Sequence, residues 1–234
     1  MKAVILAAGR GERLRPLTDK IPKPMLKVRG KPILEWAIDL LKQYGVREFF
    51  MNLHHLPVAI QSYFGKGARW GVDIHYIVEE SLHGTAGAVK LFEPWLRNET
   101  FLVYYGDNFT DFNLEKLIDF HRAKKGIGAV AFTEWENVSC SGIAELDATG
   151  RIKRFVEKPA AGGAFSHLVN AGVYILEPEI FTFIPPSQTV DFGKDIFPAL
   201  IRKNISLYGR VMEGTLHCFD TLEMYKKSEE IFSL

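Results

Sequence analysis

The stretch KAVILAAGRGERLRPLTDKIPKPMLK, residues 2–27, decides the fold of this chain and points to its chemistry. Its apolar run, residues 3–8, predicts a buried strand. The strand ends in the turn Gly9-Arg10-Gly11, where a missing Cβ lets backbone amides approach a ligand closely. Successive amides of such a turn form a concavity that binds phosphate. For these two glycines taken alone, an ordinary tight turn is the alternative reading.

The charges around the turn favour the phosphate interpretation. Between residues 10 and 27, six basic residues stand against two acidic ones, a local balance of +4 in a chain whose total is +1. A P-loop needs a lysine directly after its last glycine, but Gly11 is followed by Glu12. A dinucleotide fingerprint needs a third glycine, but Leu14 stands there. The sequence therefore predicts a polyphosphate site of another kind.

The longer pattern resembles the signature of the sugar-1-phosphate nucleotidylyltransferases. It reads A-A-G-x-G-x-R-L-x-P-L-T, then K-P-M-L and G-K-P-I, and covers residues 7–33. Glu12 stands where many members carry Thr or Ser. These enzymes condense a nucleoside triphosphate with a sugar 1-phosphate and release pyrophosphate. The resemblance implies one Rossmann-like α/β catalytic domain over residues 1–234, with a mainly parallel, mixed sheet, helices on both faces and a small inserted β region for the sugar. The sequence shows no hexapeptide repeats, so we expect no C-terminal left-handed β-helix.

Composition agrees with a compact enzyme. A chain of 234 residues with 47% hydrophobic and 24% charged residues has room for a substantial core. A net charge of +1 gives no support for nucleic-acid binding. The apolar N-terminal run is too short for a signal peptide, and no run approaches a membrane span. Two distant cysteines, Cys140 and Cys218, are typical of reduced thiols. We expect a cytoplasmic protein without nucleic-acid or membrane partners; a homo-oligomer is left open.

The order of predicted elements supports the α/β class. In the first half, strands are expected at 2–8, 48–53, 73–78 and 101–105, and helices at 32–44, 58–64, 85–96 and 114–125. Such alternation predicts a mainly parallel sheet whose ligands bind at the carboxyl ends of the strands, where Gly9, Gly106 and Asp107 should converge. In the second half, strands are expected at 129–133, 143–146, 152–156 and 171–176, a hairpin of 205–212 with 215–219, and helices at 178–183, 193–202 and 221–232.

The resemblance assigns the phosphate chemistry to the first motif. It implies that Arg13 and Lys23 are catalytic cations on the triphosphate and the reacting phosphoryl group. Ala8, Gly9 and Gly11 are the implied nucleotide-binding residues. The nucleophile is the sugar phosphate itself, already ionised at neutral pH. No general base is then required, because positioning and charge neutralisation carry most phosphoryl-type transfers.

Two aspartates are the candidate metal ligands. Asp107 follows the strand FLVYYG, and a hard divalent cation prefers such oxygen ligands. The resemblance implies that it binds Mg²⁺; a loop carboxylate capping the next helix is the alternative. Asp220 lies in CFDTLEMY, which resembles the family's W-x-D-x-G-T-x-x-x-Y but is compressed and lacks the Trp and the Gly. The N-cap of the last helix is the alternative for Asp220. Asp111 is interpreted as structural.

Three short motifs resemble the family's sugar site. In Glu157-Lys158-Pro159, the resemblance implies that Lys158 holds the sugar phosphate and Glu157 the sugar hydroxyls. Gly142 matches the glycine of the family's Y-G-[VI], with Ser in place of Tyr, and would let backbone approach the sugar. Asn170 opens N-A-G-V-Y and is the implied partner of a sugar hydroxyl. An isolated E-K-P is usually a solvated loop, but the order of the three motifs behind Asp107 supports the assignment.

The segment Gly84-Thr85-Ala86-Gly87 resembles the family's nucleobase-reading loop. G-T-A-G is common among guanylyltransferases acting on mannose or heptose 1-phosphate, which favours GTP. The rivals are a thymidylyl- or uridylyltransferase acting on glucose 1-phosphate or an amino sugar, and a catalytically silent homologue that binds nucleotide-sugar and regulates a partner. Glu157, Lys158 and Asn170 argue against relatives that load phosphocholine with CTP. His54 and His55 lack metal-ligand spacing and receive no role.

Overall fold

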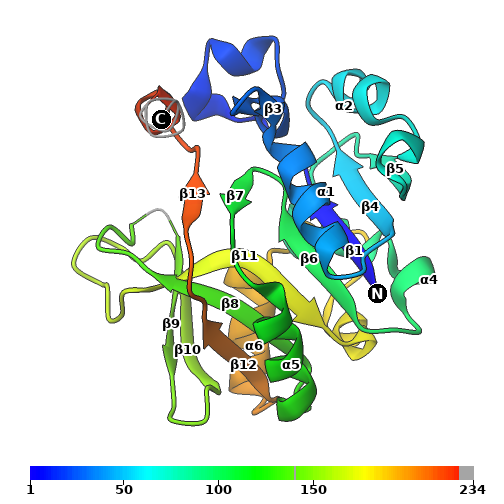
Figure 1. Ribbon diagram of the computed structural model, residues 1–234. Helices are drawn as coiled ribbons and strands as arrows, with labels where there is room; N and C mark the ends of the chain where they lie inside the picture. The colour runs from blue at the N-terminus through cyan, green and yellow to red at the C-terminus, as the bar shows by residue number, and fades with distance from the viewer. Residues whose placement is uncertain (140, 227–234) are drawn as a thin grey trace. The chain divides into compact units, whose positions relative to one another are not determined.

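A computed structural model describes residues 1–139 and 141–226 of the chain (Figure 1). The fold is of the α/β class with a mixed sheet, which confirms the predicted class. The chain divides into two compact units. The first unit comprises Met1–Leu82, Tyr104–Asp111 and the described residues from 215 onward, and the second comprises His83–Val103 and Phe112–Gly214. The single catalytic domain expected from the sequence stays a prediction.

The first unit is built on parallel strands in the order β1-β4-β5. Buried apolar side chains fill β4 because parallel strands are covered on both faces. The predicted bounds of β4 and β5 are confirmed, whereas β1 ends at Leu6, because the Ala7 amide donates to the Asn52 side chain at 3.0 Å. Its strands and helices are β1 (Lys2–Leu6), β2 (Lys27–Val28), β3 (Lys31–Pro32), α1 (Ile33–Gln43), β4 (Glu48–Leu53), α2 (Pro57–Phe64), β5 (Asp73–Val78), β7 (Asn108–Thr110) and β13 (Leu216–Cys218), with 3₁₀ turns at Glu12–Leu14, Leu17–Asp19, Lys23–Met25 and Ala68–Trp70.

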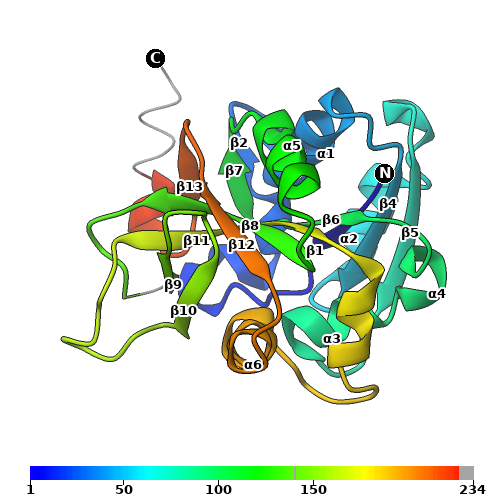
Figure 2. The same cartoon turned by 90° about the horizontal axis from the view of Figure 1, so that it is seen from below.

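The second unit holds the inserted β region, in the strand order β10-β9-β11-β8-β12. All of these pairs are antiparallel except β8 with β12. Helices α5 and α6 lie on opposite faces of β12 (Figure 2). Its elements are α3 (Gly84–Lys90), α4 (Glu93–Leu96), α5 (Leu114–Lys124), β8 (Gly128–Glu134), β9 (Gly142–Leu146), β10 (Ile152–Glu157), β11 (Leu168–Leu176), a 3₁₀ helix Pro178–Phe183, a π-helix Phe192–Ile196, α6 (Phe197–Arg202) and β12 (Leu207–Val211); β6 (Phe101–Tyr105) runs from this unit into the first.

Several sequence predictions are corrected by the structure. The predicted hairpin at 205–219 is wrong, because β12 pairs in parallel with β8 and β13 pairs antiparallel with β7. The helix predicted at 85–96 is two helices. Pro94 explains the break, since its ring clashes with the carbonyl four residues earlier, at Lys90, where α3 ends. The helix predicted at 178–183 is present with these bounds as a 3₁₀ helix, and the helix predicted at 193–202 begins within a π-helix. The helix predicted at 221–232 lies partly outside the described residues. Within its described part, residues 222–226 are helical.

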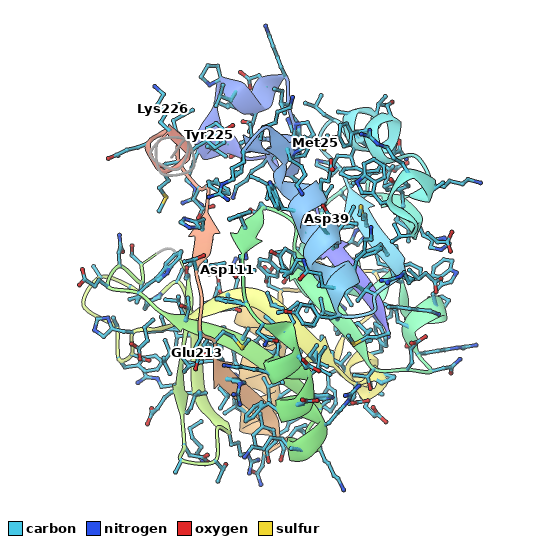
Figure 3. All side chains as sticks on the ribbon, viewed as in Figure 1. Met25, Asp39, Asp111, Glu213, Tyr225 and Lys226 are labelled. Atoms are coloured by element: carbon cyan, nitrogen blue, oxygen red, sulfur yellow. The ribbon has the colours of Figure 1, made fainter. Side chains whose placement is uncertain are left out.

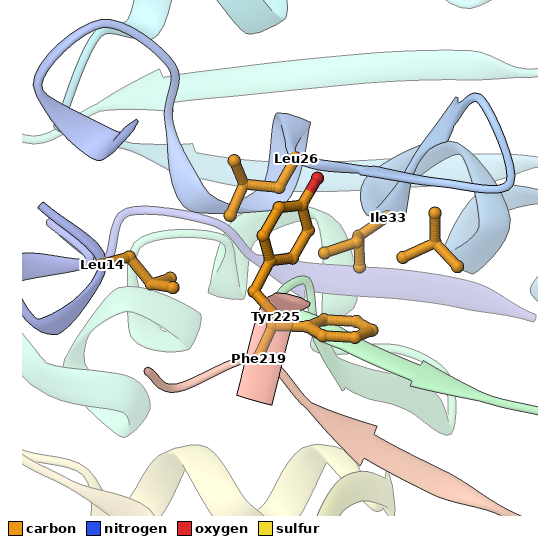
Figure 4. Packing of buried hydrophobic residues seen from close by; sticks show 6 residues of the cluster. Leu14, Leu26, Ile33, Phe219 and Tyr225 are labelled. Atoms are coloured by element: carbon orange, nitrogen blue, oxygen red, sulfur yellow. The ribbon is translucent and has the colours of Figure 1, made fainter. Parts of the chain in front are cut away.

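A buried apolar cluster ties the end of the described chain to its beginning (Figure 4). Phe219 and Tyr225 pack with Leu14, Leu26 and Ile33, and all five side chains are at most 8% exposed. The Tyr225 hydroxyl also donates to the Lys27 carbonyl at 2.9 Å. Burial of such side chains is worth about 1.5–3 kcal/mol each. The segment that carries Asp220 is therefore fastened directly to the glycine-turn segment.

Candidate active site

The two glycines of the turn, Gly9 and Gly11, lie in different surroundings. Gly11 has φ +63°, and a Cβ there would lie 2.8 Å from Thr18 Cγ2 and 3.2 Å from Lys23 Cβ. Nothing lies within 4 Å of a Cβ placed on Gly9. The Thr18 hydroxyl donates to the Gly11 carbonyl at 2.8 Å, which fixes the turn. Gly11 is thus required by conformation and packing, while the backbone at Gly9 stays open to a ligand.

Lys23 is the most buried charged group of the motif. Proline residues on both sides restrict its backbone, and it begins a short 3₁₀ turn. Its ammonium donates to Asp107 Oδ2 at 2.5 Å and to Asp220 Oδ1 at 2.6 Å, although its side chain is only 8% exposed. Burial by itself lowers the pKa of Lys23, but the two carboxylates outweigh burial and raise the pKa above its ordinary value. Lys23 is therefore charged and binds both candidate metal ligands.

Asp220 carries a second cation. Arg13 Nη2 lies 3.1 Å from Asp220 Oδ2, so the two oxygens of this carboxylate bind Arg13 and Lys23 separately. Burial raises the pKa of Asp220, but Lys23 and Arg13 outweigh burial and lower it below its ordinary value. Thr221, rather than Asp220, caps the helix at 222–226, because the Met224 amide donates to Thr221 Oγ1 at 3.2 Å.

Asp107 lies directly after β6, at the point where two strand ends meet. The Gly106 amide donates to the Leu6 carbonyl at 2.9 Å, and a Cβ on Gly106 would lie 2.8 Å from Ile5 Cγ2. Only glycine fits so close to β1. The next helix, α5, is capped by Asn113, whose Oδ1 accepts from the Glu115 amide at 3.1 Å. The helix-capping roles considered as alternatives for Asp107 and Asp220 are therefore filled by Asn113 and Thr221.

Asp111 has the structural role expected of it. It follows β7 (Figure 3), and its Oδ1 accepts from the Thr215 amide at 2.6 Å, next to the β7–β13 ladder. Cys218 on β13 is half-buried, and its Sγ lies 3.4 Å from Asn108 Oδ1. Burial is the main cause that raises the pKa of the Cys218 thiol above its ordinary value.

Sequence reasoning missed a buried polar chain that holds the start of the glycine turn. Asn52 and Glu79 are 4% and 3% exposed. Asn52 accepts from the Ala7 amide at 3.0 Å and donates to Glu79 Oε1 at 2.6 Å. These two hydrogen bonds fix the backbone at Ala7, immediately before Ala8 and Gly9. An asparagine inside the apolar run of β4 was the available signal, because a buried amide must find hydrogen-bond partners.

The predicted nucleobase loop is packed against the segment 188–192 of the second unit. Gly84 has φ +73°, and a Cβ there would lie 2.5 Å from the Val190 carbonyl oxygen. That oxygen accepts from the amides of Ala86 and Gly87 at 2.9 and 3.0 Å. Thr85 donates to Asp191 Oδ1 through both its amide and its hydroxyl, at 3.1 and 3.2 Å. These contacts fix the position of the start of α3 against residues 190–191.

Glu157 lies against two glycines. Gly142 is its register partner across β9 and β10, and a Cβ on Gly142 would lie 2.5 Å from Glu157 Oε2. A Cβ on Gly193 would also meet this oxygen. Burial raises the pKa of Glu157 above its ordinary value, and Asp191 adds to the effect while Lys158 opposes it. Gly193 and Asp191, to which the sequence reading gave no role, therefore shape the position and charge of the predicted sugar ligand.

Lys158 and Asn170 have local constraints of their own. Lys158 has φ +48°, and its amide donates to the Ser141 carbonyl at 3.2 Å. Asn170 donates to the Tyr174 hydroxyl at 2.7 Å and accepts from the Gly172 amide at 3.0 Å. A side-chain amide has two N–H donors and two acceptor lone pairs, and these two bonds use one donor and one lone pair.

The predicted residues thus fall into two groups. The first unit brings together Gly11, Arg13, Lys23, Asp107 and Asp220, with Ala8 and Gly9 at the start of the turn. The second unit contains Gly84, Thr85 and Ala86 at α3, the pair Gly142 with Glu157, and Lys158 and Asn170 in nearby strands and loops. Their assigned roles stay predictions.

The donor set of the first unit fits a divalent cation. Oxygens from two carboxylates converge on a single positive charge, within 2.6 Å of one nitrogen atom. Hard cations such as Mg²⁺ take one or two carboxylates and keep several waters. Residues 1–139 and 141–226 contain no cluster of three or more histidine, cysteine, aspartate or glutamate side chains suited to a metal. A two-carboxylate magnesium site is the arrangement that these residues support.

Comparison with known proteins identifies the family of the chain. Residues 2–216 match the family described as Nucleotidyl transferase. The chain belongs to the nucleotidyl transferase family. The resemblance inferred from residues 7–33 is thereby confirmed. Within the described part of the chain, no helix has the length and apolarity to cross a membrane.

Individual members of the nucleotidyl transferase family differ in substrate. The chain is 39% identical to a UTP–glucose-1-phosphate uridylyltransferase of Synechocystis sp. over 227 residues, covering 91% of this chain and 58% of the relative. It is 31% identical to a mannose-1-phosphate guanylyltransferase of Mycobacterium tuberculosis over 210 residues, covering 89% of this chain and 58% of the relative. The structure of HddC from Yersinia pseudotuberculosis complexed with GMP-PN superposes with a TM-score of 0.81 at 26% identity, covering 99% of each chain. The chain thus spans less than two thirds of the two curated relatives.

Proposed function

We propose that this protein condenses a nucleoside triphosphate with a sugar 1-phosphate to give a nucleotide-sugar and pyrophosphate. The observation that carries the proposal is the convergence of Asp107 and Asp220 on one cation beside Gly11. A phosphate-binding turn, two oxygen ligands for Mg²⁺ and two cations, Lys23 and Arg13, are the parts that nucleotidyl transfer needs.

The chemistry follows from these parts. An oxygen of the sugar phosphate forms a bond to the α-phosphorus, and the bond between that phosphorus and the β-bridging oxygen breaks, so pyrophosphate leaves with the electron pair. The attacking oxygen is already ionised, so no side chain has to remove a proton. Arg13 and Lys23 neutralise charge on the phosphates, and the amides at Gly9 and Gly11 orient them. Bound Mg²⁺ supplies Lewis-acid neutralisation of the phosphate oxygens.

We assign the sugar phosphate to the second-unit residues Lys158, Glu157 and Asn170. The bonds of Asn170 to the Tyr174 hydroxyl and the Gly172 amide hold its side-chain amide in place, and the carboxylate of Glu157 is held against Gly142. A cytoplasmic location remains an expectation from the sequence, which leaves a homo-oligomer open.

We propose GTP, with mannose or heptose 1-phosphate, as the substrate pair. Support comes from the G-T-A-G loop, from the guanylyltransferase relatives and from the GMP-PN complex of HddC. Gly87 also has a packing role that is independent of the nucleobase. A Cβ at this position would lie 2.8 Å from the Gln188 carbonyl oxygen, so the glycine of G-T-A-G does not by itself distinguish GTP from UTP. UTP with glucose 1-phosphate is the second candidate, favoured by the 39% identity to the uridylyltransferase.

Pyrophosphate release tests both candidates. GTP, UTP, dTTP, CTP and ATP are each combined with mannose, heptose, glucose and amino-sugar 1-phosphates in the presence of Mg²⁺. We expect release with GTP and mannose or heptose 1-phosphate; release with UTP and glucose 1-phosphate instead would establish the second candidate. Silence with every pair, from folded protein that still binds nucleotide, would favour a regulatory homologue and refute the proposed activity.

A further inference from the structure

The ammonium group of Lys23 lies where a divalent cation would lie. It is within 2.6 Å of Asp107 Oδ2 and Asp220 Oδ1, the two carboxylates to which the proposed function assigns Mg²⁺. Two carboxylates that converge in a partly buried place repel each other unless a positive charge lies between them. Lys23 supplies that charge from within the chain.

A metal ion and this ammonium cannot hold the same two oxygens at once. Mg²⁺ binds oxygen at about 2.0–2.1 Å, so an ion held by these two oxygens would lie only a few ångströms from the nitrogen atom, which lies within 2.6 Å of both. Two positive charges at such a distance repel strongly in a partly buried environment. Occupation by one cation therefore requires the departure of the other.

The side chain is built so that only its end has to move. A Cβ on Gly11 would lie 3.2 Å from Lys23 Cβ, so the base of the side chain is packed against the turn. Prolines on either side hold its backbone. Beyond Cβ, the lysine stem is flexible and carries a compact point charge. Arg13 binds the other oxygen of Asp220 and can stay in place when Lys23 leaves.

We propose that Lys23 is a displaceable counter-ion, which holds Asp107 and Asp220 together in the metal-free protein and leaves them when a divalent cation binds. Displacement frees the ammonium for the phosphates of the nucleotide, so metal loading and cation delivery are coupled. The inference rests on the proposed function only in its choice of the metal ligands.

The variant Lys23→Met removes the competing charge and keeps an unbranched apolar stem. We expect Mn²⁺, measured by electron paramagnetic resonance in the absence of nucleotide, to bind this variant roughly ten times more tightly than the wild type, about 1.4 kcal/mol. In EDTA, its melting temperature should fall below that of the wild type, and Mn²⁺ should raise it by a larger amount. Lys66→Met, at an exposed lysine, is the matched control and should match the wild type. Equal or weaker Mn²⁺ binding by Lys23→Met would overturn the inference.

A measurement on the wild-type protein keeps the test independent of that variant. Acetic anhydride labels accessible lysines, and mass spectrometry reports each peptide. We expect Mn²⁺ to increase labelling of Lys23 several-fold, while Lys66 serves as the internal reference. Unchanged labelling at saturating Mn²⁺ would refute displacement. Turnover in the substrate panel with no change in Mn²⁺ affinity would refute the inference and leave the proposed function standing; no Mn²⁺ binding by either protein would refute the inference together with the metal assignment.

Discussion

Replacing Gly84 by alanine tests whether the start of α3 is as rigid as its packing implies. The new Cβ would lie 2.5 Å from the Val190 carbonyl oxygen and 2.8 Å from the Val190 carbonyl carbon. This backbone cannot withdraw easily, because the same oxygen accepts from Ala86 and Gly87 at 2.9 and 3.0 Å. The substitution must therefore strain the backbone at position 84, displace the backbone at Val190, or break these two hydrogen bonds.

The magnitude has two parts. A left-handed backbone costs a non-glycine residue roughly 1–2 kcal/mol, and overpacking adds roughly 1–3 kcal/mol. We expect Gly84→Ala to lower the free energy of unfolding by about 2–5 kcal/mol. Gly162 lies in the same unit with φ +75°, close to the +73° of Gly84, but nothing lies within 4 Å of its added Cβ. Gly162→Ala should therefore lose only the backbone part, about 1–2 kcal/mol.

Urea denaturation followed by circular dichroism measures both variants. The difference in midpoint multiplied by the common slope gives the difference in unfolding free energy. Equal losses for Gly84→Ala and Gly162→Ala would refute the reasoning, because they would show that the Val190 segment yields without cost. Michaelis constants provide a functional readout: the constant for the nucleoside triphosphate should rise in Gly84→Ala more than that for the sugar phosphate.

Three further variants test the assigned roles. Asp107→Asn should reduce pyrophosphate release at least a hundredfold with an unchanged circular dichroism spectrum; near wild-type turnover with Mg²⁺ would remove the metal assignment. Lys158→Ala should chiefly raise the Michaelis constant for the sugar phosphate, and an effect confined to the nucleotide would contradict our division of the site. Burial raises the pKa of Glu157 in the folded protein above the ordinary carboxyl value of the unfolded chain. As the pH rises from the ordinary carboxyl pKa through the pKa in the folded protein, ionisation of Glu157 therefore lowers the free energy of unfolding. Glu157→Gln should therefore gain melting temperature over the wild type between pH 4 and pH 8, and a constant difference across this range would contradict the raised pKa.

Elements with a strong local pattern could be predicted from the sequence. The strands β4, β5 and β6 begin and end where apolar runs and their flanking residues place them. The hairpin at 205–219 failed because β12 and β13 find their partners far away in the chain, in β8 and β7. Two short strands around a glycine turn look alike in the sequence whether or not they pair with each other. The break between α3 and α4 could have been predicted from Pro94, because proline disfavours a helix interior.

The candidate site divides in the same way. The glycine turn, its basic charge and the family motif are local, so residues 2–27 and the short motifs after them indicated polyphosphate chemistry and a sugar site. For the two aspartates, the sequence left helix capping open. Only the folded chain showed that Asn113 and Thr221 do the capping.

The sequence by itself determined the class of fold, the family and the residue types of the site, because strand runs, glycine turns and motif strings are properties of neighbouring residues. Tertiary structure decided that Lys23 binds Asp107 and Asp220, which are 84 and 197 residues away in the chain. It also decided that the cluster of Phe219 and Tyr225 fastens Asp220 to the glycine-turn segment. Contacts at such separations depend on how distant elements pack, and electrostatic attraction between three charged side chains acts only after packing has brought them together.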